Sequence, residues 1–193
     1  IPVNMVYVSQ SLGEQLSVEA FYQLQWDKTI VDNCGTFFST SDVAAEGCNV
    51  GLSMAGSDYN RDDPGYIYVK KKNDREARDS GQYGVALRWL AEELNSTEFG
   101  LYSIKYHSRS PLVSSYLTTA NPFTAPAYGG GDSAVQIEYP ENIQLYGASF
   151  QTNVGVASVS GEISYRPNQP LQINASDLVL TSFNTGPLLP TQI

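Results

Sequence analysis

The sequence predicts an all-β fold in which about six strands form an antiparallel up-and-down meander with long surface loops. The first observation is a period of two. From Leu16 to Asp27 every even position is apolar or aromatic, and every odd position except Phe21 is polar or charged. The second is a strict alternation of short and long connections between the strands. The third is the absence of any apolar run of about 18 residues, which excludes a transmembrane helix.

Six segments carry the alternation. The strands are expected near residues 3–9, 16–27, 82–91, 98–107, 143–152 and 158–166. The pattern is least clean in the fourth and fifth of them. The second is long for a globular strand, and its length is close to the 9–11 residues, roughly, that a tilted strand needs to cross a bilayer.

The connections distinguish the two ends of the predicted sheet. Three are short, and Gly13 and Gly155 mark the bends of the first and the last. Two are long, residues 28–81 and 108–142, and their density of Gly, Pro, Asn and Asp predicts loops. Tight turns at one end and long loops at the other are typical of an outer-membrane barrel. We therefore expect residues 1–193 to be a single segment of a larger β-barrel, with a proline-rich tail at 167–193.

The two faces of the strands imply two environments. If the apolar face meets lipid, the opposite face lines the barrel interior. Trp26 and Trp89, near strand ends, are expected to belong to the aromatic girdles that mark the bilayer interfaces. The alternative for the polar face is the solvated side of a soluble sheet. The charged residues expected to face the lumen are Glu19, Asp27, Arg88, Lys105, Glu162 and Arg166.

The net charge and the two cysteines bear on the possible binding partners and on the cellular compartment. The net charge of −9 argues against nucleic acid, and the run Lys70-Lys71-Lys72 precedes acidic residues as a solvated loop would. Cys34 and Cys48 have turn-rich, polar flanks. We expect them to form a disulfide that closes a surface loop, with free thiols as the alternative. A disulfide favours an oxidising compartment.

No pattern in the chain predicts catalysis, and we expect no enzyme, no catalytic residue and no cofactor. His107 is the only histidine, and no nucleophile motif such as G-x-S-x-G occurs. Asp58, Asp62 and Asp63 could bind Ca²⁺ through their carboxylates, but their spacing is not that of an EF-hand loop. A solvated acidic loop is the favoured interpretation.

Four stretches together resemble a known family. They are residues 21–29, 35–42, 138–147 and 160–170, which span most of the chain. The run Tyr-Arg-Pro-Asn-Gln-Pro at 165–170 is fairly specific. The family is the proteobacterial one, common in pseudomonads, that is numbered 1302 among the domains of unknown function.

The resemblance implies an outer-membrane barrel in a Gram-negative bacterium. It also implies two partners, a periplasmic outer-membrane lipoprotein-like protein and an inner-membrane exporter of the resistance-nodulation-division type. That context implies export or trafficking of a hydrophobic small molecule. Six strands are too few to close a membrane barrel. The chain also starts at Ile1 rather than at a Met, and it lacks a terminal aromatic residue. We therefore expect a fragment of a longer protein.

Three hypotheses for function stay open. The first is a segment of an outer-membrane barrel whose parent handles a hydrophobic, lipid-like solute. The second is a binding module, in which the disulfide-closed surface loop recognises a partner outside the cell and the barrel is a platform. The third is a soluble periplasmic β-sandwich or lipocalin-like carrier. Detergent dependence of the intact protein separates the third from the other two.

Overall fold

The computed structural model describes residues 2–39, 44–45, 47, 51–55, 67–116, 134–174 and 177–178, with the backbone alone for 51–55 and 67–70. The chain divides into two compact units. Unit 1 comprises Ile1–Lys28, Ala77–Arg109 and Pro140–Pro170. Unit 2 comprises Thr29–Glu76, Ser110–Tyr139 and Leu171–Ile193. The chain passes between the units five times, each time at the end of the unit 1 strands that carries the long connections.

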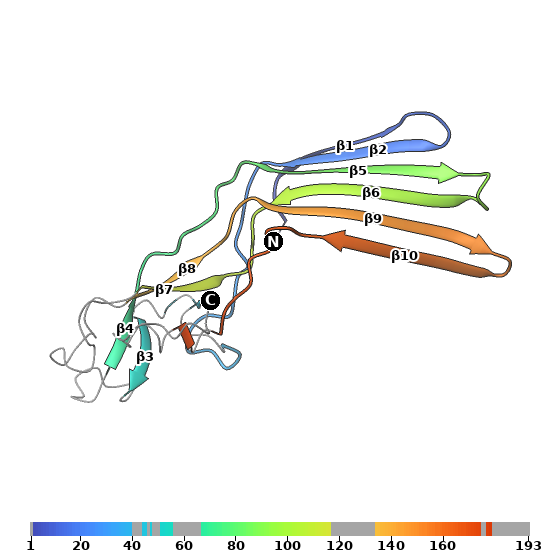
Figure 1. Cartoon of the computed structure of the whole chain (residues 1–193). Coiled ribbons are helices and arrows are strands. Elements are labelled where there is room, and N and C mark those ends of the chain that lie inside the picture. Colours follow the sequence, from blue (N-terminus) through green and yellow to red (C-terminus); the bar gives the residue numbers. More distant parts are fainter. Residues whose placement is uncertain are drawn as a thin grey trace. The chain divides into compact units, whose positions relative to one another are not determined.

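Unit 1 is a six-stranded antiparallel sheet with the strand order β1-β2-β5-β6-β9-β10 (Figure 1). Its strands are β1 (Met5–Ser11), β2 (Leu16–Gln23), β5 (Gln82–Ala91), β6 (Thr97–Tyr106), β9 (Ile143–Val154) and β10 (Ala157–Tyr165). The predicted all-β fold and the six-strand antiparallel meander are confirmed. In the part of the chain that the structure describes, the sheet is open, and β1 and β10 are its edges.

Three tight turns join neighbouring strands at one end of this sheet (Figure 1). Gly13 and Gly155 adopt φ of 134° and 62° in the first and last turns. Glycine fits these positions because it lacks the Cβ that disfavours positive φ. In the turn between β5 and β6, Asn95 and Ser96 take φ of 55° and 54°. The hydroxyl of Thr97 donates to the Leu94 carbonyl and closes this turn.

β2 ends four residues earlier than its alternation predicts. Leu24 still donates its backbone N–H to the Asn4 carbonyl at 2.8 Å. The Trp26 N–H instead donates to Oδ1 of Asp79 at 2.9 Å, and its indole N–H donates to the Ser108 carbonyl at 3.2 Å. Because the Trp26 N–H bonds to the Asp79 side chain and not to the backbone of a neighbouring strand, the sheet pairing of β2 does not extend to Trp26. Trp26 is buried, so the expectation that it belongs to an exposed aromatic girdle is wrong.

The two long connections contain strands where loops were expected. Unit 2 has a four-stranded sheet of order β3-β4-β8-β7, in which β4 and β8 are parallel and the other pairs are antiparallel. Its strands are β3 (Gly51–Ala55), β4 (Ile67–Lys71), β7 (Leu112–Tyr116) and β8 (Ala134–Glu138). Val135 and Ile137 are fully buried. Such β-branched residues favour a central strand, and β8 lies between two neighbours.

The lysine run is part of unit 2 and is not a solvated loop. Lys70 and Lys71 are the last residues of β4. The ammonium of Lys71 lies 3.2 Å from Oδ1 of Asp74. That of Lys72 lies 3.6 Å from the centroid of the Tyr116 ring, which is a cation–π geometry. Two of the three lysines therefore stabilise contacts within unit 2.

Candidate functional site: the two faces of the six-stranded sheet

The register of unit 1 shows which residues share a face. In an antiparallel pair, residues directly opposite one another project to the same side. Val18 is opposite Leu87, Leu87 is opposite Leu101, and Leu101 is opposite Ala148. Ala148 is in turn opposite Ile163. These five aliphatic residues form one row across five strands. We call the side that carries this row the apolar face and the other side the polar face.

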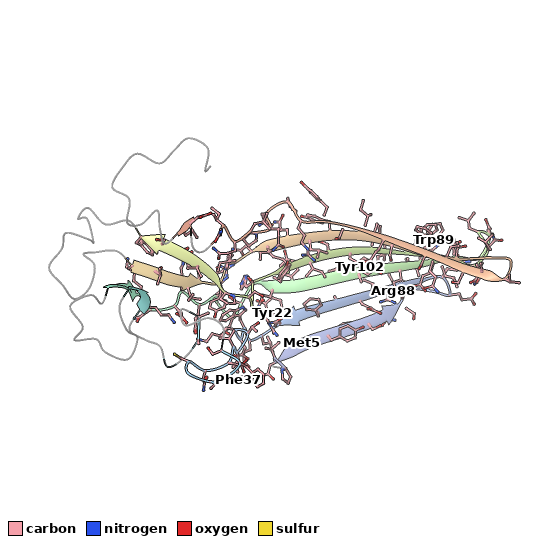
Figure 2. All side chains as sticks on the ribbon, turned by 90° about the horizontal axis from the view of Figure 1, so that it is seen from below. Met5, Tyr22, Phe37, Arg88, Trp89 and Tyr102 are labelled. Carbon is pink, nitrogen blue, oxygen red and sulfur yellow. The ribbon has the colours of Figure 1, made fainter. Side chains whose placement is uncertain are left out.

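Aromatic rows flank the aliphatic row on the apolar face. The next row toward the tight turns contains Trp89, Phe99 and Phe150. The rings of Trp89 and Phe99 are stacked with centroids 5.6 Å apart. Toward the other end, two successive rows contain the pair Tyr146 and Tyr165 and the pair Tyr22 and Tyr83. Figure 2 shows Trp89 near the turn end of the sheet and Tyr22 near the opposite end.

The apolar face is uncovered in unit 1. Fourteen large apolar or aromatic side chains on its strands are exposed, whereas on the polar face only Met5 and Tyr7 are, among the strand residues described. Soluble monomers rarely expose contiguous apolar patches larger than a few hundred Å². The fourteen are Val6, Val8, Tyr22, Tyr83, Val85, Leu87, Trp89, Leu101, Tyr146, Phe150, Val154, Val159, Ile163 and Tyr165.

The polar face carries a small charge cluster near the tight turns. The guanidinium of Arg88 lies 3.6 Å from a carboxylate oxygen of Glu19 and 3.9 Å from one of Glu98. Glu162 is on the same face, because it is opposite Ser149, which is opposite Gly100, the partner of Arg88. Of the expected lumen-facing charges, Glu19, Arg88 and Glu162 therefore share this face. Glu98 belongs with them and is found by extending the alternation of β6 back from Gly100.

Three other expected lumen-facing charges are not placed on the polar face. Lys105 is opposite Tyr83 and Gln144 and so lies at the end of the apolar face. The expectation for Lys105 is wrong, because the weak alternation of β6 does not show how it aligns with β5. Asp27 and Arg166 lie beyond the ends of β2 and β10, where strand alternation no longer fixes a face.

His107 is buried and holds three chain segments together where the strands meet the long connections. Its backbone N–H donates to the side-chain oxygen of Gln82 at 3.1 Å. Nδ1 accepts the backbone N–H of Asn142 at 3.0 Å. Nε2 lies 3.0 Å from the Ser80 carbonyl and donates to it, because a ring whose Nδ1 accepts carries its proton on Nε2. Both ring nitrogens are thus occupied by backbone groups.

Side chains of the run Tyr-Arg-Pro-Asn-Gln-Pro bond to the backbone at the start of β9, where β10 has already ended. Asn168 accepts the backbone N–H of Gln144 at 2.9 Å and donates to the Asn142 carbonyl at 2.9 Å. Its amide therefore mimics a strand backbone after β10 has ended. Gln169 accepts a hydrogen bond from the Tyr106 hydroxyl at 3.3 Å.

The candidate calcium ligands Asp58, Asp62 and Asp63 lie outside the described residues. Where the structure does describe side chains, no group of three or more His, Cys, Asp or Glu residues is placed to hold a metal ion.

Cys48 is also outside the described residues, so the disulfide stays a prediction. No helix in the described ranges is long and apolar enough to cross a membrane.

These observations define an all-β protein built on an open six-stranded antiparallel sheet with one apolar and one polar face. The chain belongs to the family described as Protein of unknown function (DUF1302), whose model matches residues 1–191, nearly the whole chain. The comparison with curated proteins and the comparison with solved structures give no match.

Proposed function

We propose that the six-stranded sheet is part of the wall of an outer-membrane β-barrel, with its apolar face against lipid and its polar face toward the lumen. The observation that carries the proposal is the composition of the apolar face. An aliphatic row lies between aromatic rows, and the large side chains of both are exposed. Membrane barrels have an outward apolar band between two aromatic girdles.

The extent of the band supports this reading. The row of Tyr22 and Tyr83 continues into Lys105 and Gln144, so it is the row at which the apolar face becomes polar. On β6 this row is eight residues from Thr97, whose hydroxyl donates to that of Thr152 on the same face. At about 3.4 Å per residue this is roughly 27 Å along the strand. The usual tilt of membrane strands reduces it to about 20 Å, which is comparable to the apolar band of about 25 Å in such barrels. The proposal requires further strands beside β1 and β10, because eight strands is about the minimum.

For the parent barrel we propose export or trafficking of a hydrophobic solute. The family resemblance supports this, and it also motivates a periplasmic lipoprotein partner and an inner-membrane exporter. We assign no catalytic residue, no cofactor and no nucleic-acid partner.

Spin labels on the aliphatic row test the orientation of the sheet. In the full-length parent folded into lipid vesicles, nitroxides at Leu87 and Leu101 should be relaxed by oxygen dissolved in lipid and shielded from a water-soluble nickel reagent. Labels at Ser149 and Gln151, on the polar face, should show the reverse, because the lumen is wet. The protein without introduced cysteines controls for labelling of native thiols. Access of the aqueous reagent to both aliphatic-row labels would refute the proposal.

One observation favours the binding-module alternative. Phe37 and Phe38 in unit 2 are 94% and 74% exposed, and their rings pack edge to face with centroids 5.1 Å apart. Exposed aromatic pairs are typical of recognition surfaces. Deleting residues 34–48 should leave solute transport intact if the barrel alone carries the function and abolish recognition if the loop does. A soluble sandwich or lipocalin-like carrier would need no detergent for extraction.

The cysteine pair gives a further prediction. A Cβ built on Gly47, the residue before Cys48, would lie 3.7 Å from the Cβ of Cys34. We expect a Cys34–Cys48 disulfide, which would stabilise the folded chain by about 3 kcal/mol through restriction of the unfolded state. Peptide mass spectrometry under non-reducing conditions should detect the linked pair. Alkylation of both thiols without reductant would contradict it.

A further inference from the structure

One row of the polar face is apolar. Tyr7 is opposite Phe21, Phe21 is opposite Gly84, and Gly84 is opposite Ile104. Ile104 is opposite Leu145. The row crosses β1, β2, β5, β6 and β9, and neighbouring strands lie about 4.8 Å apart, so it spans about 19 Å. We call these five residues the inner stripe.

Glycine at the centre of the inner stripe lets the ring of Phe21 lie against the sheet, and this ring is part of the lining of a hollow. A Cβ at Gly84 would collide with the ring of Phe21, which lies over this position. The hollow has a volume of about 180 Å³, and all inner-stripe residues except Leu145 line it, together with Ala86 and Tyr102. A cavity of roughly 150 Å³ with an apolar lining binds benzene. The hollow therefore has room for one ring or a short alkyl segment.

The charge cluster lies at one side of the same hollow. Glu19 and Arg88 are among its lining residues, and Glu98 is the second acid beside Arg88. With one cation and two anions, a ligand carboxylate would meet like charge, and a ligand ammonium would compete with Arg88. An uncharged hydroxyl can accept from the guanidinium and donate to a carboxylate without breaking either ion pair. Burying a charge that displaces one partner costs more than a neutral hydrogen bond.

We propose that the inner stripe binds the apolar part of an uncharged amphiphile whose hydroxyl head group lies against Arg88 and Glu19. The stripe faces a lumen only if the proposed function holds, so the site deepens that proposal by giving the chemical class of the solute.

Photolabelling with 1-dodecanol that carries a diazirine tests the site in the full-length parent in vesicles. Fragment mass spectrometry should locate label at Phe21, Ile104 or Tyr102, and excess unlabelled 1-dodecanol should suppress it. Label on the apolar face should not saturate, because lipid-facing residues meet dissolved probe at any concentration. At equal content in the bilayer, dodecanoate and dodecylamine should compete about tenfold less well than 1-dodecanol, a difference of about 1.4 kcal/mol.

Two variants and a matched control sharpen the test. Ile104→Thr keeps the branched shape but removes apolar surface, and Gly84→Val displaces the ring of Phe21 and so changes the lining of the hollow. Both should reduce saturable labelling about tenfold. Val159→Thr makes the same kind of change on the apolar face, at a residue that does not line the hollow, and should leave the labelling unaltered. Non-saturable labelling at every position, or an unchanged Ile104→Thr variant, would overturn the site. Equal competition by dodecanoate would overturn the head-group assignment.

The two proposals can fail separately. If labels at Leu87 and Leu101 reach water while saturable labelling of the inner stripe persists, the membrane orientation is wrong and the binding site stands. If those labels lie in lipid and the inner stripe is not labelled saturably, the barrel stands and this site is wrong.

Discussion

Arginine in place of Leu101 is expected to lower the free energy of unfolding of the parent protein in lipid vesicles by about 2–4 kcal/mol. Leu101 is 56% exposed and lies in the aliphatic row, midway between the aromatic rows. In the proposed barrel wall, a guanidinium at that depth would have neither water nor a counter-ion in reach, and the cost of a charge on a lipid face is greatest at the midplane. Val18→Arg, in the same row, should cost a similar amount.

The control is an arginine on the polar face. Gln151 is directly opposite Glu98, so Gln151→Arg places a cation beside an acid in a wet environment. Its effect should stay within about 0.5 kcal/mol, as for surface substitutions in general. Urea titration of the vesicle-bound protein, followed by the protection of the barrel from protease, gives the three free energies. Similar values for Leu101→Arg and Gln151→Arg would contradict the assignment of the faces.

The same arginine variants show whether lipid, water or another protein layer covers the apolar face. If the apolar face were exposed to water, Leu101→Arg would have little effect on stability. If another protein layer covered it, the substitution would be costly in detergent and in vesicles alike, and the cost would not change with bilayer thickness. Against lipid, the cost of arginine should fall from the aliphatic row toward Thr97, because the penalty is smaller near the interface.

The strands of unit 1 could be predicted because their signal is local. A period of two needs only neighbouring residues, and the third predicted strand, 82–91, has the bounds that β5 shows. The three tight turns follow from Gly13, Gly155 and the polar run before Thr97. The early end of β2 could not be predicted, because it depends on Asp79, which is 53 residues from Trp26.

Face assignments between strands depend on register, which is not a local property. Alternation separates Lys105 from Ile104 within β6, but it does not say which of them joins the face of Arg88. The pairing with β5 decides this and places Ile104, not Lys105, with the polar face. The four strands of unit 2 could not be predicted for a different reason. They are short, and Gly- and Pro-rich stretches separate them, so no long window shows a period.

The inner stripe also could not be predicted from single strands, because it depends on the register between them. Phe21 is the single exception to the alternation of residues 16–27, and in isolation it has no explanation. Ile104 and Leu145 are similar irregularities in the two least regular strands. Only the register brings these exceptions into one row, and there they form a continuous apolar surface.

The second large effect is expected at His107. Phenylalanine has a similar shape but no ring nitrogen, so His107→Phe leaves the Asn142 N–H and the Ser80 carbonyl without their partners. Each buried backbone group that loses its hydrogen bond costs about 1–3 kcal/mol. We expect His107→Phe to lower the free energy of unfolding by about 3 kcal/mol in total. His107→Asn, whose amide oxygen can still accept from Asn142, should have an intermediate cost.

Tyr106→Phe is the matched control, because it removes one polar group from the adjacent residue. The Tyr106 hydroxyl donates to Gln169 at 3.3 Å in an exposed position, so its loss should cost about 0.5 kcal/mol. Urea titrations of the parent protein and the three variants under one set of conditions give the ranking. A His107→Phe variant as stable as Tyr106→Phe would show that the hydrogen bonds of the His107 ring do not stabilise the fold. The expected ranking follows from burial: His107 is 1% exposed and its two nitrogens bond to chain segments 27 and 35 residues away, whereas the hydrogen bond between Tyr106 and Gln169 is exposed to water.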